Sequence, residues 1–267
     1  MPVGRNRDRV RRRHPEVVAV GGGGGGAWTP TDEIGKVSVL LMPGDYVVTG
    51  TPNVNAVGTW TDSSGNGFDA VIDSTGQQVP TDDGNGNPVY DETNSDVLII
   101  SQSLDGDLAE ADSGAFLVIA LQTDPLEATV ANYQNRTMLG GAGATPHLIA
   151  DDAGLRFGGY DSNAYIENNV AGFMSETATV CAGKWDATGV YVSIDGGNWS
   201  AVEPYGNPYV SLDPTALGAT TRVGNGFGDG HPWDGTLFLV AIYPDPADLD
   251  NAKLAQWKTW ADAQSFG

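Results

Sequence analysis

Short apolar runs separated by clusters of turn-forming residues recur along the chain from Lys36 onward. About a dozen such runs occur, which is the pattern of many short strands in two sheets packed face to face. We therefore expect an all-β sandwich. The clearest runs cover residues 37–41, 97–100, 116–121, 177–182, 189–194 and 236–243.

The run at 189–194 also predicts its own turn. Val190, Val192 and Ile194 alternate with polar positions, so one face of this strand should pack inward while the other meets solvent. The following Asp-Gly-Gly at 195–197 supplies residues that tolerate a positive φ, as a tight hairpin requires. We expect the chain to turn there and return through Asn198 and Trp199.

One helix is expected at the C-terminal side, over about residues 245–264. Asp245 is suited to the N-cap, Pro246 to the first helical position, and Asp248 to the positive end of the helix dipole. The apolar residues that follow share one side at helical spacing, so this helix should pack on the sandwich. They are Leu249, Leu254, Trp257, Trp260 and Ala261.

Composition supports a β fold that has no covalent cross-link. The 37 Gly and 15 Pro among 267 residues are too many for a mostly helical protein. No run of about 18 apolar residues occurs, so we expect no membrane-spanning segment and no membrane partner. Cys181 is the single cysteine and lies in an apolar run, which predicts a buried thiol.

We expect the first 26 residues to form a basic arm and a glycine tether, and residues 27–267 to form the sandwich with its helix. Positions 1–20 carry +4 and the remainder carries −25, so the body should repel nucleic acid. The six glycines at 21–26 match a G-x-G-x-x-G search, but no strand precedes them and no helix pattern follows, which favours a tether. The arm's arginines are Arg5, Arg7, Arg9, Arg11, Arg12 and Arg13.

Charge alone leaves the role of the arm open. Arginines can neutralise phosphates or dock on an acidic protein surface, and both need only positive charge within reach of negative charge. The remaining alternative is a solubilising tail with no partner. Nucleic-acid contact, if any, is expected through the arm alone.

The segment Trp-Thr-Asp-Ser-Ser-Gly-Asn-Gly-Phe-Asp-Ala at 60–70 resembles the signature of concanavalin A-like, laminin-G-like jelly-roll domains. The Trp-Thr-Pro at 28–30 is similar to the opening of many such proteins encoded by tailed bacteriophages. Further matches to the family's later strands occur at 87–90, 97–100, 184–196, 224 and 234–243. The resemblance covers residues 27–267 and implies a two-sheet jelly roll, but the family includes lectins, adhesion domains, glycanase modules and virion proteins.

The shared residues also have structural roles that need no ligand. Asp62 can accept backbone N–H groups across a turn, and Gly65 and Gly67 can adopt conformations closed to other residues. Trp60, at a strand end, is expected in the core.

No catalytic constellation emerges, and we expect no enzyme. Glucanases on this jelly roll carry E-x-D-x-x-E, and the nearest match, at residues 110–115, has Ala115 in place of the last carboxylate. No serine stands in a G-x-S-x-G motif. His14, His147 and His231 lack the spacing of a zinc site.

Calcium is the one cofactor that the Asp-rich turns suggest. These turns offer oxygen ligands but lack the spacing of an EF-hand, so metal-free turns are favoured over a calcium site. The candidate ligands are Asp62, Asp82, Asp83, Asp229 and Asp234.

Four aromatic residues in Gly- and Pro-rich loops are candidates for stacking on a sugar or filling a protein contact. They are Trp199, Tyr205, Tyr209 and Trp233.

The leading hypothesis is a non-enzymatic structural protein of a tailed-phage particle, located in the virion on the head or tail. The arginine arm would dock on other virion proteins with acidic surface, and related decoration proteins suggest a homo-oligomer, such as a trimer. The second hypothesis is a carbohydrate-binding receptor-recognition module on a tail, with a host surface glycan as partner. A polysaccharide-degrading enzyme ranks below both.

Overall fold

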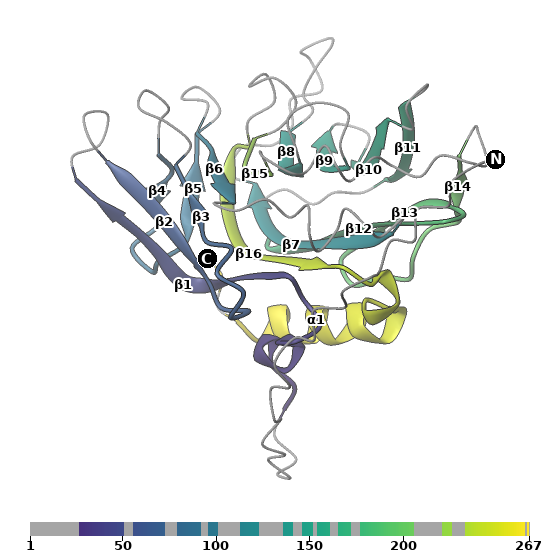
Figure 1. Ribbon diagram of the computed structural model, residues 1–267, viewed down its shortest axis with the longest axis horizontal. Coiled ribbons are helices and arrows are strands. Elements are labelled where there is room, and N and C mark those ends of the chain that lie inside the picture. Colours follow the sequence, from purple (N-terminus) through teal and green to yellow (C-terminus); the bar gives the residue numbers. More distant parts are fainter. Residues whose placement is uncertain are drawn as a thin grey trace, which may run out of the picture.

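The fold is a two-sheet jelly-roll sandwich with a single C-terminal helix among the described residues (Figure 1). It is given by a computed structural model that describes residues 27–50, 56–72, 79–91, 96–100, 113–122, 136–140, 146–151, 154–160, 165–171, 177–205, 221–225, 233–264 and 266. The all-β expectation is therefore confirmed. No helix in these ranges is both long and apolar enough to cross a membrane.

All the described strands belong to one antiparallel hydrogen-bonded system that folds over on itself. Its main path runs β11-β10-β9-β8-β15-β6-β3-β2-β1-β16-β7-β12-β13-β14, with β4 and β5 joined to the side of β16. The strands are β1 (Val39–Thr49), β2 (Val57–Asp62), β3 (Ala70–Val71), β4 (Thr81–Asp82), β5 (Pro88–Tyr90), β6 (Leu98–Ile100), β7 (Gly114–Gln122), β8 (Arg136–Gly140), β9 (His147–Asp151), β10 (Gly154–Tyr160), β11 (Tyr165–Val170), β12 (Thr179–Asp186), β13 (Gly189–Ile194), β14 (Glu203–Pro204), β15 (Arg222–Val223) and β16 (Gly235–Tyr243).

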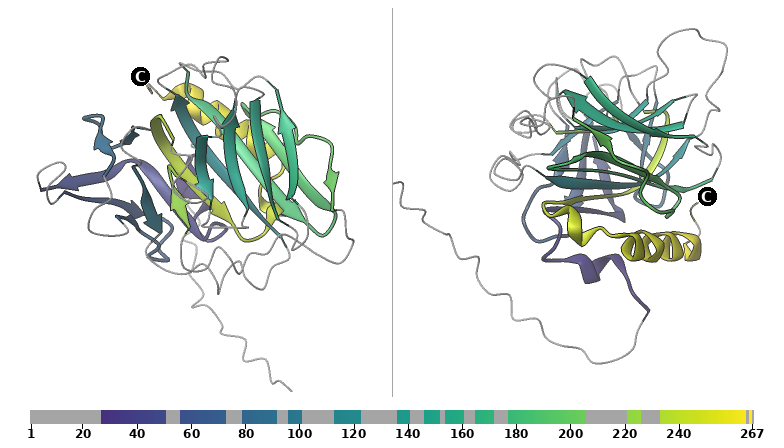
Figure 2. Two further views of the ribbon diagram at one scale, coloured as in Figure 1. Left: turned by 90° about the horizontal axis from the view of Figure 1, so that it is seen from above. Right: turned by 90° about the vertical axis from the view of Figure 1, so that its right-hand side faces the viewer.

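Three layers are visible in the figures. Strands β8 to β11 form one layer, strands β16, β7, β12 and β13 form the next, and helix α1 (Asn251–Ala263) lies beneath the second layer (Figures 1 and 2). The main core fills the space between the two sheets and includes Phe116, Phe157 and Trp185, whose rings contact one another. We call the β16-β7-β12-β13 layer the back sheet.

The back sheet is apolar on both faces because it lies between two apolar layers. Its outer face forms a second core with α1, in which Leu254, Trp257 and Ala261 of the helix pack on residues such as Leu117 and Ala241. This explains why β7 and β16 read as continuous apolar runs and not as alternating ones. Cys181 lies within this sheet, and its predicted burial is confirmed.

The predicted hairpin at 195–197 is confirmed, with one difference on its outer face. Asp195 and Gly196 have φ angles of 54° and 70°, and the Gly197 amide donates to the Ile194 carbonyl at 3.0 Å. Val190 and Val192 point into the main core as expected. Ser193, expected at the solvent face, is buried and donates its hydroxyl to the Gly197 carbonyl at 2.7 Å.

The helix begins later than predicted. Asp245 and Pro246 do start a helical turn, but that turn is a short 3-10 segment, η6 (Pro246–Asp248), in which the Asp245 carboxylate accepts from the Ala247 amide. The α-helix starts at Asn251, and Asp250 is its N-cap, accepting from the Lys253 amide at 2.8 Å. The predicted apolar face is otherwise correct, with Trp260 only half-buried.

Candidate functional site

A cationic and aromatic cluster lies on the outer face of the back sheet, made of Lys184, Tyr191 and Trp199; we call it the Lys184 cluster. The Lys184 Nζ lies 4.5 Å from the centre of the Tyr191 ring and 5.0 Å from the centre of a Trp199 ring. All three side chains are half-buried. An ammonium at these distances from two aromatic rings is attracted by their quadrupoles.

The register of the back sheet explains why the cluster is open. Lys184 on β12 pairs with Tyr191 on β13 and, on its other side, with Ala115 on β7, which in turn pairs with Tyr243 on β16. Paired residues share a face of a sheet. Ala115 and Tyr243 are buried in the second core with α1, whereas Lys184 and Tyr191 continue the same row beyond that cover.

The hairpin turn brings Trp199 over this row. After the turn at 195–197, the Ser200 amide donates to the Val192 carbonyl at 2.9 Å, which holds the returning chain beside β13. The Trp199 Nε1 donates to the Leu249 carbonyl and its backbone amide to the Asn251 side chain, both at 3.0 Å. The indole is therefore fixed between the hairpin and the start of α1.

Tyr191 is also held in place. Its hydroxyl shares a 2.6 Å hydrogen bond with Thr188 Oγ1, which donates to the Asp186 carboxylate at 2.5 Å. Burial lowers the pKa of Lys184, and the charge of Asp186 raises it in part. Within the described ranges the Lys184 ammonium forms no salt bridge. The cluster thus offers two fixed rings and a cation that can donate hydrogen bonds.

The four predicted aromatic candidates do not share one site. Trp199 belongs to the Lys184 cluster, while Tyr205 packs against the main core and donates its hydroxyl to the Gly189 carbonyl at 3.3 Å. Trp233 was wrongly expected at a contact surface, because its side chain is completely buried in the main core. Tyr209 lies outside the described residues.

Among the calcium candidates, Asp62 has a structural role. Its carboxylate accepts from the amides of Leu40, Ser64 and Phe68 at 2.9–3.0 Å and from the Ser64 hydroxyl at 2.7 Å. Those bonds occupy both oxygens inside a buried turn. The structural interpretation of the 60–70 segment therefore agrees with the geometry.

Other parts of that segment are structural as well. Trp60 is buried and donates Nε1 to the Met42 carbonyl at 2.7 Å, as its predicted core position requires. Gly65 and Gly67 have φ angles of 87° and 79°, which L side chains rarely adopt.

The remaining calcium candidates are dispersed. Asp82 and Asp83 each accept two backbone amides within their own exposed turn. Asp234 forms a salt bridge of 3.4 Å with Arg136, and Asp229 lies outside the described residues. In the described ranges no three His, Cys, Asp or Glu side chains come together in a way that would hold a metal ion. The arm arginines also lie outside those ranges.

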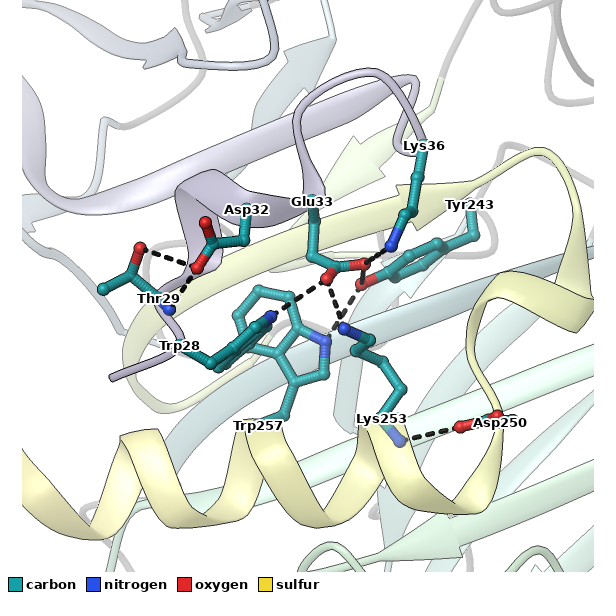
Figure 3. A network of polar contacts seen from close by, with 9 residues as sticks. All are labelled: Trp28, Thr29, Asp32, Glu33, Lys36, Tyr243, Asp250, Lys253 and Trp257. Carbon is teal, nitrogen blue, oxygen red and sulfur yellow. Dashed lines mark hydrogen bonds and ion pairs between the residues drawn. The ribbon is translucent and has the colours of Figure 1, made fainter. Parts of the chain in front are cut away.

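A second polar cluster surrounds Glu33, whose carboxylate is completely buried beside α1 (Figure 3). It accepts from the Trp28 Nε1 at 3.1 Å and forms a salt bridge of 2.5 Å with Lys253. The Tyr243 hydroxyl donates to it at 3.5 Å and accepts from the Trp257 Nε1 at 2.9 Å. Burial, and then the charge of Glu33, raises the pKa of Tyr243.

The Glu33 cluster fixes the chain at the start of the described residues. Glu33 ends the 3-10 turn η1 (Pro30–Glu33), so its bonds tie this turn to β16 and to α1 at once. Trp28 also packs edge-on against Trp257, with ring centres 4.9 Å apart. Every partner of this carboxylate belongs to the body, which makes the cluster an anchor for residues 28–33.

The sequence contains a signal for the Lys184 cluster, but that signal lies in two paired strands and not in the aromatic loops. The alternation that sends Val190 and Val192 inward sends Tyr191 outward, and strand pairing across the hairpin then places Lys184 beside it. No sequence pattern shows how far α1 extends, and its extent decides whether the helix covers Lys184 and Tyr191.

No family model matches the chain, and no curated protein is similar to it in sequence. Solved structures with the same fold include the binding domain of botulinum neurotoxin serotype D/C VPI 5993, with a TM-score of 0.54 at 11% identity over 85% of this chain and 52% of that chain. A botulinum neurotoxin DC binding domain in complex with SialylT gives 0.51 at 10% identity, over 81% and 51%.

A third similar structure is a Trypanosoma rangeli sialidase in complex with 2,3-difluoro-KDN, with a TM-score of 0.55 at 12% identity over 93% of this chain and 36% of that chain. The chain therefore spans about half the length of the neurotoxin chains and about a third of the sialidase. These matches include both binding domains and an enzyme. At such low identity they confirm the β-sandwich fold.

Proposed function

We propose that this chain is a non-catalytic glycan-binding module and that the Lys184 cluster contacts the sugar. The observation that carries the proposal is the pair of half-buried rings, Tyr191 and Trp199, whose centres lie 4.5 and 5.0 Å from the ammonium of a lysine that has no salt bridge among the described residues. Aromatic side chains supply contact area at little cost in conformational entropy, because each has only two χ angles to fix.

The chemistry of the cluster favours an acidic sugar. The apolar ring faces can pack against sugar C–H groups, while the ammonium can donate charge-assisted hydrogen bonds to a carboxylate. The comparisons support this choice, since one similar fold was solved with SialylT and another with a nononic-acid analogue. They favour glycan binding over the particle role as the primary function.

The test is a glycan array with neutral and acidic sugars, followed by calorimetric titration of the best ligand. Trp199→Ala removes a ring and Lys184→Met keeps the aliphatic stem but removes the charge, so each should weaken binding at least about tenfold. Trp260→Ala is the matched control, since it truncates another half-buried Trp outside the cluster and should bind normally.

Two results would contradict the proposal. One is the absence of binding across the whole array, and the other is equal loss in all three variants, which would indicate general damage to the fold. Thermal unfolding of each variant separates such damage from loss of the site.

A particle-associated role for the same module is our second proposal, and it rests on charge segregation. Positions 1–20 carry +4 beside a body of −25, so the arm alone suits docking on an acidic surface of other virion proteins. Deleting residues 1–26 should abolish attachment to the particle while the body stays folded. Attachment retained by the deletion variant would refute the role of the arm.

A further inference from the structure

An open groove of about 510 Å³ runs along the exposed side of α1, where the helix meets the chain at residues 27–29. Trp28 and Trp260 contribute its large apolar side chains, and Ala252, Ala255, Thr259 and Ala263 contribute the small ones. None of the described residues that line it is charged. A groove of this size and polarity suits a narrow apolar segment and lies within the usual volume range of binding sites.

We propose that the groove holds residues 17–20 of the same chain, Val-Val-Ala-Val, which are the one apolar run of the arm. The location supports this occupant first. Ala27 lines the groove, and only the six glycines at 21–26 separate it from Val20. The segment is therefore tethered at the mouth of the site.

The lengths are compatible. A six-residue Gly tether has an r.m.s. span of about 13 Å. Four extended residues cover about 13 Å. The lining residues of α1 run from Ala252 to Gln264, about 18 Å along a helix. A linker of this length gives an effective concentration in the mM range, so even a docking Kd of about 1 mM would leave the groove about half occupied.

Shape and charge point the same way. The Glu33 cluster already holds Trp28 in position, so one side of the groove is preformed (Figure 3). Asp250 and Asp262 are exposed near the two ends of α1, and Asp262 also forms an ion pair with Lys258. The body as a whole carries −25. The arginines at 11–13 precede the docking segment by four residues, so docking brings them toward this acidic surface.

Disulfide trapping in the full chain tests the proposal. The double variant Val18→Cys with Ala255→Cys places one thiol in the docking segment and one in the groove, at an exposed helix position that tolerates the change. The native Cys181 does not interfere, because it is completely buried and burial raises the pKa of its thiol. Intramolecular cross-linking should be at least about tenfold faster than for Val18→Cys with Val57→Cys, where the second thiol lies on β2.

The matched control changes the apolar contacts and leaves the tether unchanged. Adding Val17→Asp and Val20→Asp to the Val18→Cys, Ala255→Cys variant should slow trapping at least about tenfold. An unchanged rate would overturn the proposal, because tether proximity alone would then explain the cross-link. Two other outcomes would also overturn the proposal. Covalent dimers would assign the groove to a second copy of the chain. Slow trapping, together with a small apolar molecule retained in native mass spectrometry, would assign the groove to that molecule.

Discussion

Asp62 illustrates how the hydrogen bonds of a single side chain can account for a family-like segment. Its two oxygens accept three backbone amides and one hydroxyl, and these bonds hold the turn between β2 and β3 against the start of β1. Water does not replace these bonds, because Asp62 is only 8% exposed. The carboxylate therefore stabilises the turn directly.

Asp62→Ala should cost at least about 3 kcal/mol in the free energy of unfolding. The change leaves three amides without their acceptor, and each such orphaned group costs about 1–3 kcal/mol when buried. Chemical denaturation measures the loss. Asp82→Ala is the control. The Asp82 carboxylate accepts two amides, but in an exposed turn where water can replace it. The free energy of unfolding should therefore fall by only about 1 kcal/mol. Equal losses would refute the structural role of Asp62.

Individual residues were predictable where the residue type and its neighbours favour a single environment. A Trp at a strand end and a Cys in an apolar run were expected in the core, and Trp60 and Cys181 lie there. Trp233 was misplaced because an aromatic residue in a Gly-rich loop gives no sign of which way it points. Lys184 was not singled out, since its value as a site depends on Trp199 arriving from beyond the hairpin.

At the scale of elements, the helix shows why a boundary is harder to predict than a face. Asp245 and Asp250 are both good N-cap residues, and the apolar spacing that begins at Leu249 fits either start. The structure uses both in series, with the 3-10 turn η6 preceding the α-helix. Strands of nine residues such as β7 were predictable from their apolar runs, whereas the two-residue strands β3, β4, β14 and β15 carry too little pattern.

The two caps can be separated by experiment. Asp250→Ala should cost about 1 kcal/mol in the free energy of unfolding, because it removes the acceptor for the Lys253 amide at the first turn of α1. Asp245→Ala affects only the three-residue turn η6 and should cost less. Urea unfolding of both variants gives the comparison. A larger loss for Asp245→Ala would indicate that α1 depends on the earlier turn.

For the molecule as a whole, excess negative charge is the dominant electrostatic feature. The chain carries −21 at pH 7, so its acidic groups repel one another in the compact state. The division at residue 26 stays a prediction, although the Glu33 cluster shows that the body begins to make ordered contacts by Trp28. Protonation of a buried carboxylate should therefore stabilise the fold in two ways. It removes the cost of burying a charge, and it reduces the net negative charge of the chain.

Asp96 is the buried carboxylate that makes this testable. Burial raises its pKa to about 6, against the opposing effect of the hydrogen bond from the Asp91 amide, and the charge of Asp91 adds to the rise. A pKa that is higher in the folded than in the unfolded state means that the folded state binds the extra proton between about pH 4 and 6. Stability must then fall as pH rises through that window.

The expected fall from Asp96 is at most about 3 kcal/mol between pH 4 and 7, from a shift of about two units at 1.36 kcal/mol each. Stability should therefore be greatest near pH 4, since below that pH carboxylates such as Asp83 lose their contribution. Burial opposes the shift of Asp83, but its hydrogen bonds with Asn87 and Asn85 lower its pKa overall. Denaturation of Asp96→Asn across this range should show a flatter slope from pH 4 to 7, while Asp83→Asn should change only the acid side. An unchanged slope in Asp96→Asn would mean that general repulsion, and not this carboxylate, controls the pH dependence.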